Sequence, residues 1–499
     1  MGISFNNIPE SIRTPGAYTE VDNSRALQGL AQNPHKALII GQKTSDGAAA
    51  LEVIKQITSD GLADGFFGPG SILARMCNKF KENNPNTELH AIALSNDGGV
   101  KAEGIIKFDS GMSATANTTY YLMINGTKVY VTITSAWSVT DVNSAILAKV
   151  NSMDALPVIA STSASAAGSD HVVLVAKQSG TLGNYINVRA NYYIGQSNPA
   201  GWSEQGIIHD SLAGGSVDPD LGDAWAVIDN EQYHYIIQPY IDASNLGEIE
   251  TELADRFKPL EDLQGHGFAA VRGTQASCTT LGNSRNSPHN TISGFYDSPS
   301  CPEEWAAAWG AQAAWNLNND PARPLHTLQL KGILAPPIEN RFNQSERNIL
   351  LYDGIATWIC DSSGNVLIER SITTYQTNAL GVTDPSYLDI QTLATLGEIK
   401  YQYKIRMVNR FIIPRMKLAD DGFPVQPGSN VVTPRTIKQE ILSLFAELQL
   451  EGLIENFNDF KDNLIVQRNS SDVNRVDVLL PPDLINQFRI LASVIQFIL

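Results

Sequence analysis

The sequence predicts an α/β (α+β) fold with a core domain assembled from both chain ends, an inserted β-rich domain, and extended N- and C-terminal arms. Three observations predict it. Strand and helix patterns alternate before and after residues 96–214, which is typical of a mainly parallel sheet. The intervening stretch is poor in charge, with seven charged residues between positions 109 and 183. Each terminal segment carries a strand pattern without a partner strand beside it.

The expected domain boundaries follow from these changes in pattern. Residues 1–30 form the N-terminal arm, and residues 96–214 form the inserted outer domain. The discontinuous core comprises residues 31–95 plus 215–499, including a C-terminal arm at 475–499. A chain of 499 residues can bury such a core without help from disulfides or metals.

The N-terminal arm contains one short strand pattern. Pro15 and Gly16 oppose a helix, and Ala17–Asp22 then alternates between two faces. Because a lone strand is not stable, this segment must pair with the body of the protein or with another chain.

The first core segment predicts a strand, a helix and a second strand, at Ala37–Ile40, Ser71–Glu82 and Leu89–Leu94. The loop Gly41–Gly47 after the first strand contains Gly, Lys and Thr, as phosphate-binding loops do. Its spacing fits neither GxxxxGK[ST] nor GxGxxG, so a nucleotide site is not predicted.

The insert is predicted mainly from a hairpin signal. Two β-type runs flank Asn125-Gly126, a pair that favours the positive φ angles of a two-residue turn. A helix is expected at Val139–Val150, and strands at His171–Ala176 and Ile186–Tyr192.

After the insert the alternation of strands and helices resumes. The expected strands are Tyr235–Ile237, Gly267–Arg272, Thr291–Tyr296, Ile349–Cys360 and Val366–Tyr375. The expected helices are Leu246–Phe257, Thr274–Leu281, Cys301–Asn316 and Ser386–Phe411. Trp305 and Trp309 share one helix face without Trp315, and we interpret them as core packing rather than as a stacking platform.

The C-terminal region ends in an apolar segment. Thr433-Pro434 begins a helix, and a second helix is expected at Leu453–Leu464. A strand at 475–480 stops at two prolines, and the last residues, Asn486–Leu499, are apolar and β-prone. Such an end would be an aggregation hazard if free, so either its own domain or a neighbouring subunit must cover it.

Composition and charge exclude several classes of protein. Lys plus Arg number 35 and Asp plus Glu 52, a net charge of −17, which argues against a nucleic-acid or anionic-membrane binder. No apolar run approaches the roughly 20 residues of a membrane span, and no secretory signal is visible. Charged residues are only 17% of the chain, which indicates either a surface covered by other subunits or a β-rich protein with uncharged polar faces.

Enzyme and metal motifs are not found in the sequence. It contains no GxSxG elbow and no HExxH, and its four cysteines form no CxxC pair. His234 is interpreted as a half-buried strand residue, His266 as a turn residue, and Asp420-Asp421 as a solvated turn rather than a cation site. We therefore predict no catalytic activity, no cofactor and no metal.

Eight segments, spread from end to end of the chain, have a recognisable sequence. They are Ile3–Pro9, Arg13–Pro15, Tyr18–Ser24, Ala37–Gln42, Asn340–Asn348, Ile454–Val466, Asn474–Phe488 and Val494–Phe497, and Leu479-Leu-Pro-Pro-Asp483 is the most specific part. In these segments the chain resembles the tail sheath proteins of Mu-like contractile-tailed bacteriophages.

The resemblance implies a virion structural protein. Such subunits stack as six-fold rings in a helix around a tail tube and contract to drive the tube through the bacterial envelope. The implied partners are further copies of the chain, the tail tube protein, and baseplate and tail terminator proteins, with no nucleic acid and no membrane insertion. The implied location is the tail sheath of the virion, assembled in the cytoplasm of the host bacterium.

The resemblance also implies roles for particular residues. The arms of such proteins add strands to neighbouring subunits, and a helix of the C-terminal domain faces the tube. Carried onto this chain, the arm strands contain Tyr18, Thr19, Val21, Phe488, Ile495, Phe497 and Leu499. The arm hinges are Pro15, Gly16, Pro481 and Pro482. The tube-facing residues are Glu455, Asp459, Lys461 and Asp462.

Two alternatives remain open at this point. A sheath from a tailocin or a contractile injection system would have the same sequence features. A soluble α/β enzyme with a β insert is the alternative from a different class, and it should tolerate loss of residues 1–25.

Overall fold

The computed structural model describes most of the chain. The described residues are 14–16, 19, 30–95, 98–109, 111–162, 171–203, 207–209, 211–424, 426 and 429–498. The chain divides into two compact units, one made of residues 34–397 with 486–499, the other of residues 1–33 with 398–485.

The larger unit is built on an eight-stranded sheet in the order β15-β14-β13-β12-β11-β1-β3-β2. The strands from β14 to β3 run parallel, and the edge strands β15 and β2 are antiparallel to their neighbours. Their bounds are β1 Lys36–Gln42, β2 Lys55–Gln56, β3 Glu88–Leu94, β11 Tyr235–Ile237, β12 His266–Arg272, β13 Asn290–Phe295, β14 Ile355–Cys360 and β15 Val366–Arg370. The expected mainly parallel sheet is therefore confirmed, with strands from both sides of the insert.

Helices cover both faces of this sheet. The α-helices of the unit outside the insert are α1 Leu62–Phe67, α2 Ile72–Asn83, α4 Gly222–Ile228, α5 Ala243–Arg256, α6 Gln275–Asn283, α7 Pro302–Asn319, α8 Gln344–Tyr352 and the start of α9 Ile390–Met407. Successive residues of β12 show the two faces, because Phe268 and Ala270 join the cluster that contains α7. Ala269 and Val271 join a second cluster with α5, α6 and α8. Burial on both faces explains why these strands are apolar throughout.

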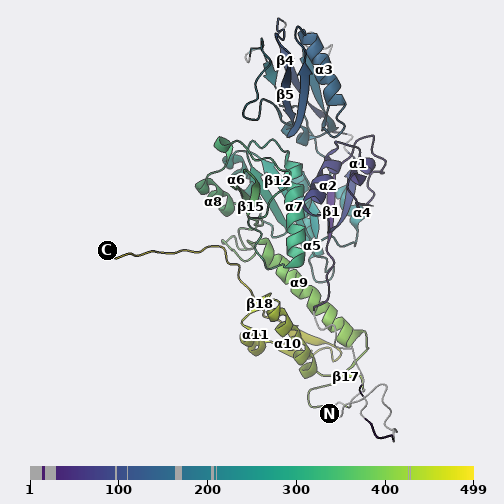
Figure 1. The fold of residues 1–499 in the computed structure, drawn as a ribbon. Coiled ribbons are helices and arrows are strands. Elements are labelled where there is room, and N and C mark those ends of the chain that lie inside the picture. The colour runs from purple at the N-terminus through teal and green to yellow at the C-terminus, as the bar shows by residue number, and fades with distance from the viewer. Residues whose placement is uncertain are drawn as a thin grey trace. The chain divides into compact units, whose positions relative to one another are not determined.

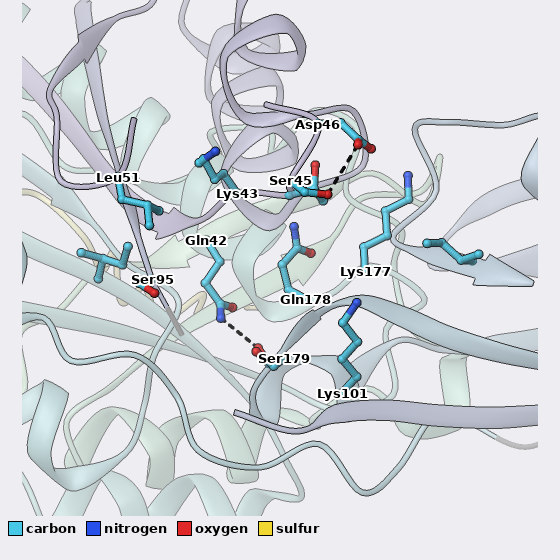
Figure 2. Close-up of a pocket in the computed structure, with 13 residues that line it drawn as sticks. Gln42, Lys43, Ser45, Asp46, Leu51, Ser95, Lys101, Lys177, Gln178 and Ser179 are labelled. Carbon is cyan, nitrogen blue, oxygen red and sulfur yellow. Dashed lines mark hydrogen bonds between the residues drawn. The ribbon is translucent and has the colours of Figure 1, made fainter. Parts of the chain in front are cut away.

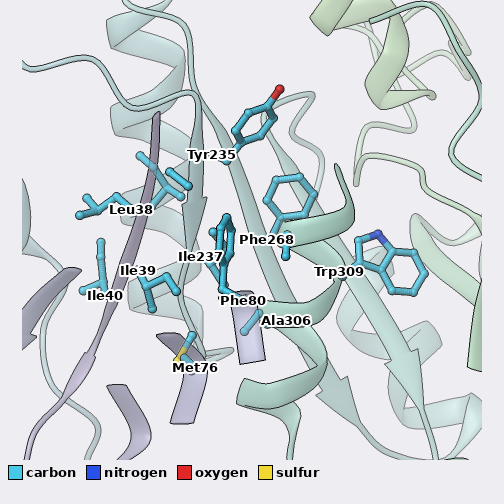
Figure 3. Close-up of a cluster of buried hydrophobic side chains, with 14 of the residues drawn as sticks. Leu38, Ile39, Ile40, Met76, Phe80, Tyr235, Ile237, Phe268, Ala306 and Trp309 are labelled. Atoms are coloured by element: carbon cyan, nitrogen blue, oxygen red, sulfur yellow. The ribbon is translucent and has the colours of Figure 1, made fainter. Parts of the chain in front are cut away.

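The main core lies where α2 and α7 pack side by side on the sheet (Figures 1 and 3). Met76 and Phe80 of α2 and Ala306 and Trp309 of α7 are at most 1% exposed. Position 310 requires glycine, because a Cβ there would come within 2.5 Å of Ile237 Cγ1. The absence of a side chain thus lets α7 lie directly on β11.

The tryptophans behave as predicted. Trp305 stacks on Phe295 with ring centroids 4.4 Å apart, and both Trp305 and Trp309 are buried. Trp315 is 39% exposed and does not share their face. The core-packing interpretation of this pair is confirmed.

The insert has its own sheets and its own hydrophobic core. Its strands form a four-stranded sheet, β10-β4-β8-β7, and a three-stranded sheet, β6-β5-β9. Asn125 and Gly126 turn between β5 and β6 with φ angles of 48° and 74°, so the hairpin is confirmed. The elements are β4 Lys101–Phe108, β5 Thr118–Ile124, β6 Thr127–Ile133, α3 Val139–Asn151, β7 Val158–Ser161, β8 His171–Ser179, β9 Val188–Ala190 and β10 Ile207–His209.

The second unit is organised around α10, Pro434–Leu450. Thr433 caps this helix by accepting a hydrogen bond from Thr436 N, as the sequence predicted. Phe445 stacks on Phe460 of α11 with centroids 4.0 Å apart. The remaining elements are the end of α9, a π-helical turn Val408–Ile412, β16 Lys417–Leu418, β17 Val431–Val432, β18 Ile454–Glu455, α11 Phe457–Asn463, β19 Ile465–Arg468, β20 Val476–Leu479 and β21 Asp483–Leu484.

Two expected elements begin later in the structure than the sequence predicted, for local reasons. The strand predicted from Ile349 begins only at Ile355, because residues 344–352 form α8. Asn343 and Glu346 build a capping box that starts this helix, and local capping outweighed the β-prone run. The helix predicted from Leu453 begins at Phe457, because Asn456 has a φ of 50° and the preceding pair forms β18.

Candidate functional site

The end of the C-terminal arm is an extended apolar segment without regular structure (Figure 1). Ile495 is 90% exposed and Phe497 is 78% exposed. The other exposed large apolar side chains of the segment are Phe488, Ile490, Leu491, Val494 and Ile498. Covering of residues 486–499 by the chain's own domain was one of two expectations, and it is wrong for the large apolar side chains from Phe488 to Ile498, which are all exposed.

The base of the arm is held by one arginine. Arg489 Nη1 lies 2.5 Å from Asp389 Oδ1, one residue before α9 begins. The same carboxylate also pairs with Arg370 of β15 at 3.2 Å. Burial lowers the pKa of Arg489, and Asp389 opposes that effect. These contacts fix where the exposed segment starts.

The N-terminal arm strand falls largely outside the described residues, which exclude Tyr18 and Val21. Leu499 of the other arm is also outside them. Thr19, Pro15 and Gly16 are described and are exposed. Their roles in strand addition and as a hinge stay predictions.

A two-stranded sheet in the second unit has open edges. β19 pairs with β20 in antiparallel register, from Ile465 opposite Leu479 to Arg468 opposite Val476. Among the described residues, no further strand joins this pair. Ile465 is 49% exposed and Leu479 57%. The sequence analysis missed β19, although the β-branched pair at 465–466 was a signal for it.

The predicted hinge prolines lie between two paired strands. Pro481 and Pro482 connect β20 to β21. β21 pairs with β18, with Ile454 opposite Leu484. The unit that contains these strands ends at Ile485.

Three of the four predicted tube-facing residues lie on one short helix. Asp459, Lys461 and Asp462 are exposed on α11, whereas Phe460 is 1% exposed and packs inward. Glu455 lies in β18, so the prediction that it shares their helix is wrong. The positive φ of Asn456 separates the strand from the helix.

The two histidines considered as catalytic candidates, His234 and His266, pack against other side chains of the fold. His234 stacks on His35 with centroids 4.0 Å apart, as a partly buried residue beside β11. His266 is 6% exposed and begins β12, so it is not the expected turn residue. Its ring Nε2 lies 2.8 Å from Thr291 Oγ1. Burial lowers the pKa of both histidines well below the usual value.

The acidic pair Asp420-Asp421, considered as a cation site, has partners within the protein. Asp420 pairs with Arg468 at 2.8 Å, and Asp421 accepts a hydrogen bond from Arg435 N. Within the part of the chain that the structure describes, no cluster of three His, Cys, Asp or Glu side chains could hold a metal. The helices of that part include none with both the length and the apolar character of a membrane span.

Sequence comparison gives a full-length relative. The chain is 37% identical over 501 residues to the Mu-like prophage FluMu tail sheath protein of Haemophilus influenzae, with all of both chains covered. Residues 214–374 match the phage tail sheath protein central domain, and residues 382–498 match the phage tail sheath C-terminal domain.

Solved sheath structures give weaker matches. The sheath tail protein of Desulfitobacterium hafniense matches with a TM-score of 0.49 and 14% identity, covering 95% of this chain and 97% of that one. The helical sheath of the anti-feeding prophage in its contracted state matches with a TM-score of 0.49 and 10% identity, covering 97% and 99%. The full-length relative decides the assignment: the chain belongs to the phage tail sheath protein family and is a structural subunit of a contractile tail sheath.

Proposed function

We propose that this subunit polymerises as stacked hexameric rings around the tail tube and that the stack contracts to drive the tube through the bacterial envelope. Its partners are further copies of the chain, the tail tube protein, and baseplate and tail terminator proteins. The sheath assembles in the cytoplasm of the host bacterium.

The exposed C-terminal arm carries this proposal. Ile495 and Phe497 are two residues apart, so an extended strand places both on one face. Both are largely exposed in the single chain, and a neighbouring subunit would bury them by strand addition. The open sheet of β19 and β20 is the acceptor that we propose, because its exposed Ile465 and Leu479 would meet the added side chains.

Strand addition would stabilise each contact between two subunits by several kcal/mol. A net stabilisation of about 0.5–1.5 kcal/mol per backbone hydrogen bond gives a few kcal/mol for about five bonds. Each buried Ile or Phe adds about 1.5–3 kcal/mol as an upper range. Because every subunit has several such links, modest single contacts hold the assembly through multivalency.

The proposed domain organisation keeps the boundaries expected from the sequence: arms at 1–30 and 475–499, an insert at 96–214, and the core between them. We propose that Pro15-Gly16 and Pro481-Pro482 act as hinges, so that the bodies of the subunits turn while the exchanged strands stay paired.

The tube contact is proposed for the polar face of α11. Asp459, Lys461 and Asp462 are exposed there, and Glu455 is partly exposed in β18. Exposed charge contacts are weak and screened by salt. A contact of this kind between sheath and tube would break easily during contraction.

Negative-stain electron microscopy of the purified protein, alone and with the tail tube protein, tests the proposal. The full chain should form tubes or stacked six-fold rings, and chains lacking residues 1–25 or 486–499 should not. The melting temperature of the 486–499 deletion should stay close to that of the full chain, because the large apolar side chains of this segment are exposed. Tubes formed by either deletion would refute the role of that arm.

A further inference from the structure

A pocket of about 430 Å³ lies at the carboxyl ends of β1 and β3, where the insert meets the sheet of the larger unit (Figure 2). Gln42 ends β1 and Leu94 ends β3, and the opposite wall comes from Lys101 of β4 and from the last residues of β8. Ligands of open α/β sheets bind at this end of the strands. The volume lies within the range of small-molecule sites.

The walls of the pocket carry an excess of positive charge. Three lysines, Lys43, Lys101 and Lys177, line it together with one acidic residue, Asp46. Lys101 has no ion-pair partner among the described residues. The local charge of this pocket is thus opposite in sign to the net charge of the chain, which is −17.

The other two lysines are bound only to backbone oxygens in the described part of the chain. Lys43 Nζ donates to Gly47 O at 3.0 Å. Lys177 Nζ donates to Asp154 O at 2.6 Å and to Pro69 O at 3.0 Å. Burial lowers the pKa of Lys177, and the carboxylates of Asp154 and Asp46 raise it. An added negative charge in the pocket would therefore stabilise this ammonium group.

Two buried amides on the pocket wall have unused hydrogen-bonding atoms. Gln42 is 3% exposed, and its Nε2 donates to Ser179 O at 2.9 Å, which leaves Oε1 without a partner. Gln178 is 8% exposed, and its Nε2 has no acceptor. Buried polar atoms without partners are costly and need an explanation. A ligand that both accepts and donates hydrogen bonds would supply one.

The loop after β1 does not bind phosphate through its backbone as a P-loop does. Thr44 N donates to Phe67 O at 2.9 Å, and Gly47 N donates to Thr44 O at 3.2 Å, so these amides are already used. Two of the loop's backbone donors are therefore unavailable to a ligand, so the side chains of the pocket are the main groups left to bind one.

We propose that this pocket binds a small anion that also carries a hydroxyl donor, of the class of hydrogen phosphate, sugar phosphates and hydroxycarboxylates. The lysines would hold the anionic oxygens. Gln42 Oε1 and Gln178 Nε2 have almost no accessible surface in this structure, so the two amide groups would turn toward the ligand, Gln42 to accept from its hydroxyl and Gln178 to donate to an anionic oxygen. Because the ligand would contact Gln42 and Lys43 on one side and Lys101 and Gln178 on the other, it would tie the insert to the sheet.

Calorimetric titration of the full chain with inorganic phosphate and with sulfate tests the proposal. At pH 8 both are mainly divalent, but only hydrogen phosphate has a hydroxyl donor, so phosphate should bind more tightly and raise the melting temperature more. Glycerol 3-phosphate should bind at least as tightly as phosphate. Equal affinities for phosphate and sulfate would overturn the role of Gln42, and no binding of either at 10 mM would overturn the site.

A charge-matched pair of variants tests the location. Lys101→Gln should weaken phosphate binding about tenfold or more, because a charge-assisted contact is lost. Lys149→Gln removes the same charge from an exposed helix position of the insert that does not line the pocket, so its affinity should be unchanged. An equal loss in both variants would show general attraction to the insert and would overturn the pocket.

Discussion

Replacing both Ile495 and Phe497 by serine should strongly raise the protein concentration needed for assembly without weakening the fold of the subunit. The two side chains are 90% and 78% exposed, so the single chain gains almost nothing from them. The control is Gln496→Ser, which changes the residue between them on the opposite face of an extended strand.

The magnitude follows from the area that a neighbouring subunit could cover. Full burial of an Ile or Phe side chain contributes about 1.5–3 kcal/mol, so the pair contributes about 3 kcal/mol even at the lower limit. Since each 1.4 kcal/mol is a factor of ten, the concentration at which tubes form should rise about 100-fold or more.

Sedimentation of polymer over a series of protein concentrations, followed by electron microscopy, measures this threshold. Thermal unfolding of the same samples reports on the fold. The reasoning is refuted if the double variant forms tubes at the concentration of the unsubstituted chain, or if Gln496→Ser raises the threshold equally. A large fall in the melting temperature would contradict the exposure of the two side chains.

Three further predictions concern the single subunit. Arg75→Ala leaves Glu303 buried without its cation, so urea unfolding should show a loss of about 3–5 kcal/mol, and an unchanged midpoint would contradict it. Burial lowers the pKa of His289 to about 4, below its unfolded value of about 6.5. The free energy of unfolding that this neutral ring preserves is therefore fully present above pH 6.5 and is lost as the pH falls towards 4. Urea unfolding at pH 7, 6 and 5 should show this loss, and a slope as steep in His289→Gln would contradict it. Arg489→Ala removes the ion pair with Asp389, so chymotrypsin should cleave at Phe488 faster, and equal cleavage rates would argue against the anchor.

Local signals made much of the fold predictable. The Asn125-Gly126 turn and the Thr433 cap are set by residues within a few positions of each other, and the structure has both. The helix α8 was missed although its capping box, Asn343 and Glu346, is a local signal of the same kind. The spacing of Asn343 and Glu346 is therefore by itself a signal that a helix begins there.

Long-range features could not be predicted in this way. The carboxylate that holds Arg489 belongs to Asp389, 100 residues earlier in the chain. The anion pocket joins short stretches of β1, β3, β4, β7 and β8, none of which carries a recognisable motif. Only the fold brings such residues together, and no periodic pattern in the sequence indicates that they are neighbours.

The packing of the core limits how the subunit could change during contraction. α7 lies so close to β11 that a single Cβ at Gly310 would clash, and the arginine at position 75 is held in the interior by Glu303 and Glu304. Burial acts to lower the pKa of Arg75, and these two carboxylates reverse that effect and raise it. Close-packed interiors resist gradual deformation, so a large movement is expected between rigid bodies. The apolar side chains at 488–498 lie outside this interior, where they can hold neighbouring subunits together without loosening either body.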